Sequence, residues 1–193
     1  MKTFTKLAVC LCVLLINSSQ LSADENFTFR NTRWGMSLEE VKVSEPLEPA
    51  QTAGDMIGYK TKVLQKDVLL AYIFADKKLV RAKYVLAERH SNKTDFIQDY
   101  KDFKKILTEK YGKPKREDVV WKDDFYKSDP SHWGMAVATG RLSYFSTWET
   151  SDSEIICALY GDNFNITCGV EYTSKSLRQI EKNIQQKKEL NNF

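Results

Sequence analysis

The chain has 193 residues, of which 42% are hydrophobic and 28% charged, and its formal net charge is +3. This length fits one ordinary domain, or two small halves that share a hydrophobic core. Because acidic and basic residues interleave along the whole chain, the sequence gives no basis for binding a nucleic acid or an anionic membrane surface.

Residues 1–23 predict a cleaved signal peptide. Lys2 and Lys6 form a positive start, an unbroken apolar run follows over residues 7–16, and small polar residues lead to a cleavage site after Ala23. The apolar run is too short to span a bilayer of about 30 Å. Cys10 lies too early in that run for a lipoprotein signal. We therefore expect a protein that is exported to the periplasm or secreted, without a lipid anchor or a membrane span.

The mature chain, residues 24–193, begins with signals for a short helix and a group of strands. Ser37 and Glu40 form a capping box, which marks a helix start, and Pro46 ends that helix. We expect a loop over residues 48–55. Three strands are then predicted as an antiparallel meander, over residues 57–64, 68–74 and 79–87.

A long helix is predicted next, with clear signals at both ends. Asn92 or Thr94 caps its start, apolar residues recur at helical spacing, and Gly112 ends it. The opposite face of this helix is highly charged and is expected to be solvated, although a face that binds a partner is the alternative.

The second half repeats the order of the first. A strand over residues 119–125 leads to a helix that begins at the N-cap Asp129 and closes at Gly140. Three further strands are predicted over residues 142–147, 155–160 and 164–172, and a final helix begins near Ser174 or Ser176. We therefore predict an α+β fold in which two units, each a helix with a three-stranded antiparallel meander, pack as one body.

The two units correspond to residues 24–114 and 115–193 of a single domain. No low-complexity linker separates them. We therefore expect either one continuous sheet or two sheets packed together.

Cys157 and Cys168 predict a structural disulfide. Cys10 and Cys12 leave with the signal peptide, so the mature chain keeps an even pair, as is typical of an oxidising compartment. A hairpin with a four-residue loop, folded about residues 162–163, would place the two cysteines directly opposite each other, with their Cβ atoms about 4.5–5.5 Å apart. The alternative is a pair of buried free thiols. The same register predicts one apolar face formed by Ile155, Cys157, Leu159, Ile166, Cys168 and Val170.

The sequence contains no motif that names a reaction. It has no metal-binding spacing of His or Cys in the mature chain, no G-x-S-x-G elbow and no phosphate-binding glycine loop. Cofactors and metals are therefore not expected. A cluster of Asp123, Asp124 and Asp129 with His132 is a candidate acid–base site for an unrecognised hydrolase or a small-ligand binder. The alternative for His132 is a partly exposed residue in the first turn of a helix.

Aromatic residues are abundant in the second half and are candidates for a partner-binding surface. Aromatic side chains suit such surfaces because they bury a large area with few rotatable bonds. The alternative is that they fill the space between the helices and the sheet. The candidate surface residues are Trp121, Trp133, Trp148, Tyr144 and Tyr160.

The tripeptide Trp-Gly-Met occurs at residues 34–36 and again at residues 133–135. In the first copy it precedes the predicted helix, and in the second it lies inside one. The repeated letters are therefore interpreted as an accident rather than as a duplicated site.

The stretch "FRNTRWGMSLEEVK" resembles the N-terminal part of small exported bacterial proteins of unknown function, in which Trp-Gly and a short S-x-E-E-V helix follow the signal peptide. The order of helix and meander, present twice, is similar to the tandem modules of β-lactamase-inhibitor proteins and of the SmpA/OmlA outer-membrane assembly lipoproteins. The chain departs from these in having one short opening helix and no lipobox. The resemblance assigns no functional residues. The absence of catalytic spacing, the signal peptide and the twofold order of elements together predict a non-enzymatic exported protein that binds a protein or peptide in the cell envelope through its sheet or its aromatic surface. An envelope-structural protein is a further alternative.

Overall fold

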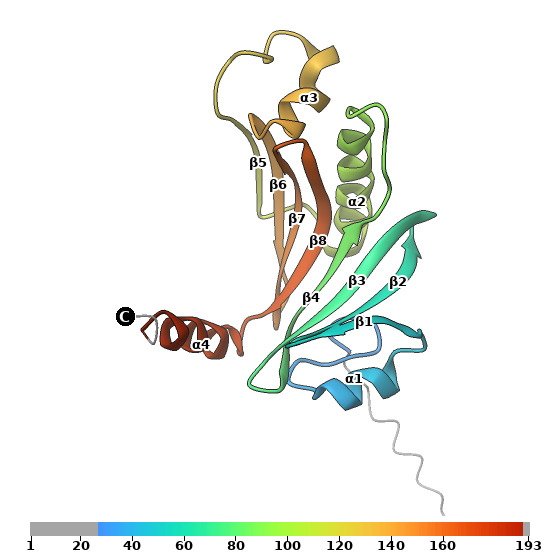
Figure 1. Cartoon of the computed structure of the whole chain (residues 1–193), viewed down its shortest axis with the longest axis vertical. Helices are drawn as coiled ribbons and strands as arrows, with labels where there is room; N and C mark the ends of the chain where they lie inside the picture. Colours follow the sequence, from blue (N-terminus) through green and yellow to red (C-terminus); the bar gives the residue numbers. More distant parts are fainter. Residues whose placement is uncertain (1–26, 191–193) are drawn as a thin grey trace, which may run out of the picture.

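The strands of the computed structural model, which describes residues 27–190, form an eight-stranded antiparallel sheet (Figure 1). Their order across the sheet is β1-β2-β3-β4-β8-β7-β6-β5, so each half of the chain supplies four consecutive strands. The last strands of the two halves, β4 and β8, pair with each other in the middle. The strands are β1 (Pro49–Ala53), β2 (Met56–Val63), β3 (Lys66–Ala75), β4 (Lys78–Leu86), β5 (Arg116–Trp121), β6 (Leu142–Glu149), β7 (Ser153–Asp162) and β8 (Asn165–Ser174).

The predicted α+β class is confirmed, and six predicted strands lie within two residues of β2, β3, β4, β6, β7 and β8. The finer prediction of two units with three strands each is not confirmed, because β1 and β5 add a fourth strand to each half. The prediction of a loop over residues 48–55 is wrong, because β1 lies there. Its residues are all exposed, so no alternation of buried and exposed positions marks β1 as a strand. Pro49 and a bulge beside it fit an edge position.

The strand predicted over residues 119–125 instead ends at Trp121 and begins at Arg116. The Asp123 carboxylate accepts a hydrogen bond from the Phe125 backbone N–H at 3.1 Å, so the chain turns there instead of continuing the ladder. Strand β5 is thus the second edge of the sheet. Its central residues Val119 and Val120 are both exposed.

The helices lie at the ends and on one face of the sheet. They are α1 (Leu38–Ser44), α2 (Asp95–Tyr111), a 3₁₀ turn η1 (Pro130–His132) that leads into α3 (Trp133–Ala138), and α4 (Arg178–Leu190). The Ser37–Glu40 capping box is confirmed, as is the end of α2 at Gly112. Helix α2 packs on the face of β6, β7 and β8, whereas α4 projects from the end of β8 (Figure 1). No helix of the described residues is long and apolar enough to cross a membrane.

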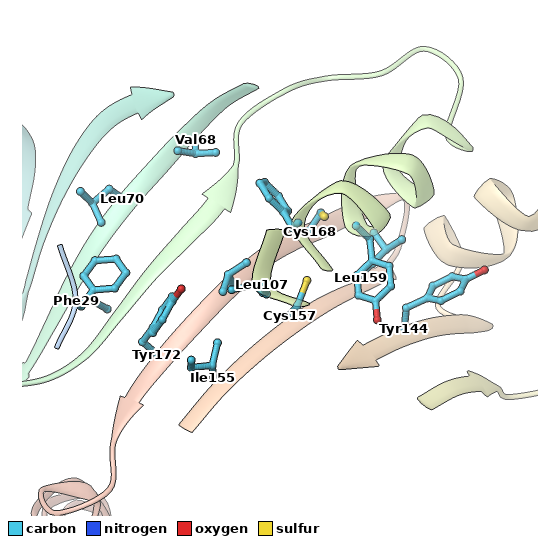
Figure 2. Packing of buried hydrophobic residues seen from close by; sticks show 14 of the residues in the cluster. Phe29, Val68, Leu70, Leu107, Tyr144, Ile155, Cys157, Leu159, Cys168 and Tyr172 are labelled. Atoms are coloured by element: carbon cyan, nitrogen blue, oxygen red, sulfur yellow. The ribbon is translucent and has the colours of Figure 1, made fainter. Parts of the chain in front are cut away.

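The hydrophobic core continues along one face of the sheet, where α2 packs on β6, β7 and β8 and where Phe29 packs on Tyr72 of β3 and Tyr84 of β4. Tyr100 of α2 makes a 2.7 Å hydrogen bond to Ser146 of β6, and its ring packs 5.3 Å from that of Tyr144. Figure 2 shows Leu107 of α2 above the same face, near Cys157, Cys168 and Tyr172. We call this side of the sheet the covered face and the opposite side the open face.

The β7–β8 hairpin corrects the predicted register. Asp162 pairs with Asn165, so the turn contains two residues, Asn163 and Phe164, both with positive φ. This two-residue turn moves the register by two from the prediction, and Cys157 faces Val170 instead of Cys168. Because side chains alternate with a period of two, the predicted apolar face survives the shift.

The predicted disulfide is not present in the described structure, where Cys157 and Cys168 are buried free thiols. Figure 2 shows both sulfur atoms beneath α2 on the covered face. Diagonal neighbours in a sheet lie farther apart than directly opposed residues, so the observed register removes the geometry on which the disulfide was predicted. The predicted signal peptide, residues 1–23, lies outside the described residues.

A buried ionic network binds the N-terminal segment, residues 27–45, to the sheet. The fully buried Glu45 carboxylate at the end of α1 accepts two hydrogen bonds from the Arg30 guanidinium, each 2.8 Å long. It accepts a third, at 2.6 Å, from the Tyr72 hydroxyl of β3. Next to this network the Phe29 ring packs 4.8 Å from the Tyr172 ring of β8 (Figure 2). The N-terminal segment therefore joins both halves of the sheet.

The two Trp-Gly-Met tripeptides serve different structural purposes. Gly35 has φ +89° in the turn before α1, whereas Gly134 lies within α3. A Cβ atom on Gly134 would lie 2.3 Å from the Thr94 backbone nitrogen, so only glycine lets α3 approach the start of α2 this closely. This difference agrees with the interpretation of the repeat as an accident.

Candidate functional site

The five aromatic residues predicted as a partner surface do not lie together. Trp148 and Tyr144 are buried on the covered face, and the Trp148 indole N–H donates to the Gly112 carbonyl at 2.9 Å. These two residues are part of the core. Trp121 and Trp133 are half-buried and pack edge to face at 5.9 Å, which fastens α3 to the end of β5. Of the five, Tyr160 alone lies on the open face and is 44% exposed.

The carboxylates predicted as an acid–base cluster each have a separate partner. Asp123 pairs with Arg141, and Asp124 pairs with Lys127. Asp129 accepts from the Ser131 backbone N–H and hydroxyl, and it contacts the His132 ring at 2.8 Å.

The Asp129 group is an N-cap. The hydrogen bond from the Ser131 hydroxyl, followed by the contact with His132, lowers the pKa of the Asp129 carboxyl below its ordinary value. Asp129 and His132 are both more than half exposed, so nothing excludes water from them. A site in which two carboxylates and a histidine converge is therefore not assembled here.

The cysteines are placed as core residues and not as nucleophiles. Burial raises the pKa of the Cys157 thiol to about 12 and also raises that of Cys168. A nucleophilic cysteine needs its thiolate form near neutral pH. Both thiols are therefore neutral and inert in the folded protein.

The open face carries a feature that the sequence analysis did not assign. A groove with a volume of about 240 Å³ crosses strands β4, β8, β7 and β6. Its floor is formed by Ala158 and Gly169, which are direct partners in the β7–β8 ladder. Phe145, Ile156, Tyr160 and Val85 form its apolar sides. We call this feature the open-face groove.

The floor of the groove is constrained by strand packing. A Cβ atom on Gly169 would lie 2.3 Å from the Tyr84 carbonyl oxygen of β4, so a larger residue cannot replace this glycine without moving a strand. Because Phe145 of β6 pairs with Ala158 of β7, an aromatic ring lies beside the small residues that form the floor. The rings of Phe145 and Tyr160 are nearly parallel, with centroids 6.5 Å apart. The shape of the groove is thus set by the residues that pair with one another across strands β4, β8, β7 and β6.

Charged residues border the apolar groove at one end. Glu171 of the lining is bound to Arg81 at 3.3 Å, and Arg81 also binds Glu181 of α4 at 2.7 Å. Lys83 of the lining forms no ion pair with any described residue, and the same holds for the exposed Lys60 on β2. Lys83 lies directly opposite Glu171 in the β4–β8 ladder, so the border of the groove carries a lysine without an ion pair beside a carboxylate that is bound to Arg81.

The sequence contained one local signal for this groove, and the remaining lining residues gave none. Residues 155–160 are an unbroken apolar run, and such a run is typical of a strand that is apolar on both faces. Val85 and Gly169, which also line the groove, lie far apart in the sequence and meet only through the β4–β8 pairing.

Comparisons of the chain with protein-family models, with curated proteins and with solved structures found no match. Within the described residues, no group of three or more His, Cys, Asp or Glu side chains is placed to hold a metal ion. The open-face groove is therefore the best candidate for a functional site among the described residues.

Proposed function

We propose that this chain is a non-enzymatic binding protein that acts after export and holds an apolar segment of a partner protein in the open-face groove. The observation that carries this proposal is that the groove is apolar although it lies on the open face of the sheet, and such a face is ordinarily polar because it contacts water. An antiparallel sheet with one covered face usually presents polar side chains on the other. Here Ile156 and Tyr160 are 37% and 44% exposed at the centre of that face.

The charges around the groove define the partner more closely. Lys83 lies in the groove lining and Lys60 lies on the same face, and neither is neutralised by a described residue. A segment that fills the groove with large apolar side chains and carries a carboxylate beside them would complement both features. The partner is therefore a short apolar and acidic protein segment. The small size of the groove favours a weak, transient complex over a permanent one.

The test is a selection of short random peptides against the purified chain, followed by affinity measurements on the enriched sequences. We expect enrichment of peptides with two or more large apolar residues and at least one Asp or Glu. Ala158→Arg, which fills the groove floor, should weaken their binding at least tenfold. The matched control is Val43→Arg on α1, where the side chain is already 89% exposed and is not part of the groove lining.

A second pair of variants tests the charge. Lys83→Glu should weaken binding of the acidic peptides by several-fold, whereas Lys78→Glu at the exposed start of β4 should not. No enrichment at all, or enriched peptides that bind Ala158→Arg as well as the unaltered chain, would overturn the proposal.

A further inference from the structure

A second cavity lies on the covered face, separate from the open-face groove. It has a volume of about 240 Å³ and lies between the C-terminal half of α2, the end of β2 and the N-terminal segment. Its lining includes Phe29, Val63, Phe103, Leu107, Val170 and Tyr172. Figure 2 shows Phe29, Leu107 and Tyr172 on this side of the sheet. We call it the α2 cavity.

The interior of the α2 cavity is apolar with a few hydroxyl groups. Tyr84, Tyr111 and Tyr172 contribute to its lining, and the rings of Tyr111 and Tyr172 lie 6.4 Å apart. Binding sites for small molecules commonly have this composition, with apolar walls and a small number of polar groups that orient the ligand.

Two cations also line the cavity, and they differ in availability. The Arg30 guanidinium is held by Glu45, and its remaining nitrogen approaches the Tyr84 hydroxyl at 3.4 Å. The Lys110 ammonium lies 5.0 Å from the centre of the Tyr111 ring and forms no ion pair with a described residue. Lys110 is therefore free to bind a negatively charged group at the cavity.

The mouth of the cavity is apolar and includes a strained residue. Leu64 and Ile106 line the cavity and are 39% and 40% exposed. Leu64 has φ +53° in the two-residue β2–β3 turn, a conformation that favours Asn or Gly. The positive φ belongs to the turn itself, since the two-residue turns at Asp76–Lys77 and Asn163–Phe164 have the same backbone conformation, and a branched apolar residue there is costly. Here the side chain of Leu64 extends the apolar wall to the cavity entrance.

We propose that the α2 cavity binds a small fatty-acid-like anion, with its carboxylate at Lys110 and its apolar chain among Phe103, Leu107 and Tyr172. Three observations support this ligand class: the apolar lining, the available cation and the exposed apolar entrance. The volume lies below the roughly 300–1,000 Å³ of sites for drug-sized ligands, so a single short acyl chain is the appropriate size.

The test is isothermal titration calorimetry of the purified chain with octanoate, with octanol as an uncharged molecule of equal chain length and with acetate as a charge without a chain. We expect octanoate to bind at least tenfold more tightly than octanol, and acetate not to bind. Lys110→Gln should reduce octanoate affinity about tenfold and leave octanol unchanged. Lys105→Gln, on an exposed position of the same helix, is the matched control and should bind octanoate normally.

Two further variants locate the octanoate site within the fold. Ile106→Trp, at the exposed entrance of the α2 cavity, should abolish octanoate binding without affecting the core. Ala158→Arg in the open-face groove should leave octanoate binding unchanged, which makes this inference independent of the proposed peptide site. Failure of octanoate to bind, or equal binding to the unaltered chain and to Lys110→Gln, would overturn it.

Discussion

Removal of the Glu45 carboxylate should be among the most damaging single changes to this protein. The side chain is fully buried and accepts three hydrogen bonds, two from Arg30 and one from Tyr72. Glu45→Ala would leave a guanidinium and a buried hydroxyl without their partner. Breaking a buried pair in this way typically costs about 3–5 kcal/mol. The Arg30 side chain is 27% exposed and can turn toward water, so we expect a loss of about 3 kcal/mol, at the lower end of that range.

The measurement is urea-induced unfolding followed by circular dichroism, with the dependence of free energy on urea compared between variants. Tyr72→Phe keeps the Arg30–Glu45 pair and should cost about 1 kcal/mol. The double variant should cost little more than Glu45→Ala alone, because the two changes remove one shared network. Glu39→Ala, whose side chain is 78% exposed, is the control and should cost less than about 1 kcal/mol. A loss below about 1 kcal/mol for Glu45→Ala would refute the reasoning, because the network would then contribute no more than a surface pair.

Other features of the core give further expected outcomes. Because burial raises the pKa of the Cys157 thiol to about 12, neither it nor Cys168 should react with a thiol reagent at pH 8 until urea unfolds the chain, and mass spectrometry should find both reduced. Rapid labelling of the folded protein would contradict their burial. Gly134→Ala should lower the free energy of unfolding by at least about 2 kcal/mol through the clash with α2, whereas Gly58→Ala, with no atom closer than 3.8 Å, should change it by less than half as much. Leu64→Asn should raise the melting temperature by relieving the left-handed strain while weakening octanoate binding, and a fall in melting temperature would count against that strain.

The fold class and most strands were predictable because, in strands such as β6, residues that face the core alternate in the sequence with residues that do not. In β6, residues from Leu142 to Trp148 alternate between buried and half-buried, which gives the period-two signal of a strand with one covered face. The edge strand β1 has no such alternation, since all of its residues are exposed. The pairing of β1 with β2 is therefore seen only in the structure, because the residues of β1 form no pattern that predicts a strand.

The register of the β7–β8 hairpin shows a different limit of sequence reasoning. A shift of two residues keeps every side chain on its face, so the hydrophobic pattern cannot distinguish a four-residue loop from a two-residue turn. The shorter turn requires positive φ at both Asn163 and Phe164; asparagine tolerates this conformation, but phenylalanine does not favour it, so the residues of the turn gave only half of the signal. The predicted disulfide failed for this reason.

The candidate site was less predictable than the fold. The apolar run over residues 155–160 indicated a strand without a polar face, but the groove also needs Val85 from the other half of the chain. Val85 comes close to residues 155–160 only because β4 pairs with β8, and this pairing joins segments that are far apart in the sequence. The aromatic residues that stood out in the sequence were mostly used to fill the core.

The β4–β8 pairing also has a consequence for folding. Each half of the sheet is a meander of neighbouring strands, which can form early because its contacts are local in sequence. The five residue pairs between β4 and β8 close the longest loop and should form last. During synthesis, the first four strands are complete before β8 exists, and β4 then has an unpaired edge. A chain truncated after α2 should therefore be prone to aggregate through that edge, and the last strand protects the first half as well as completing the second.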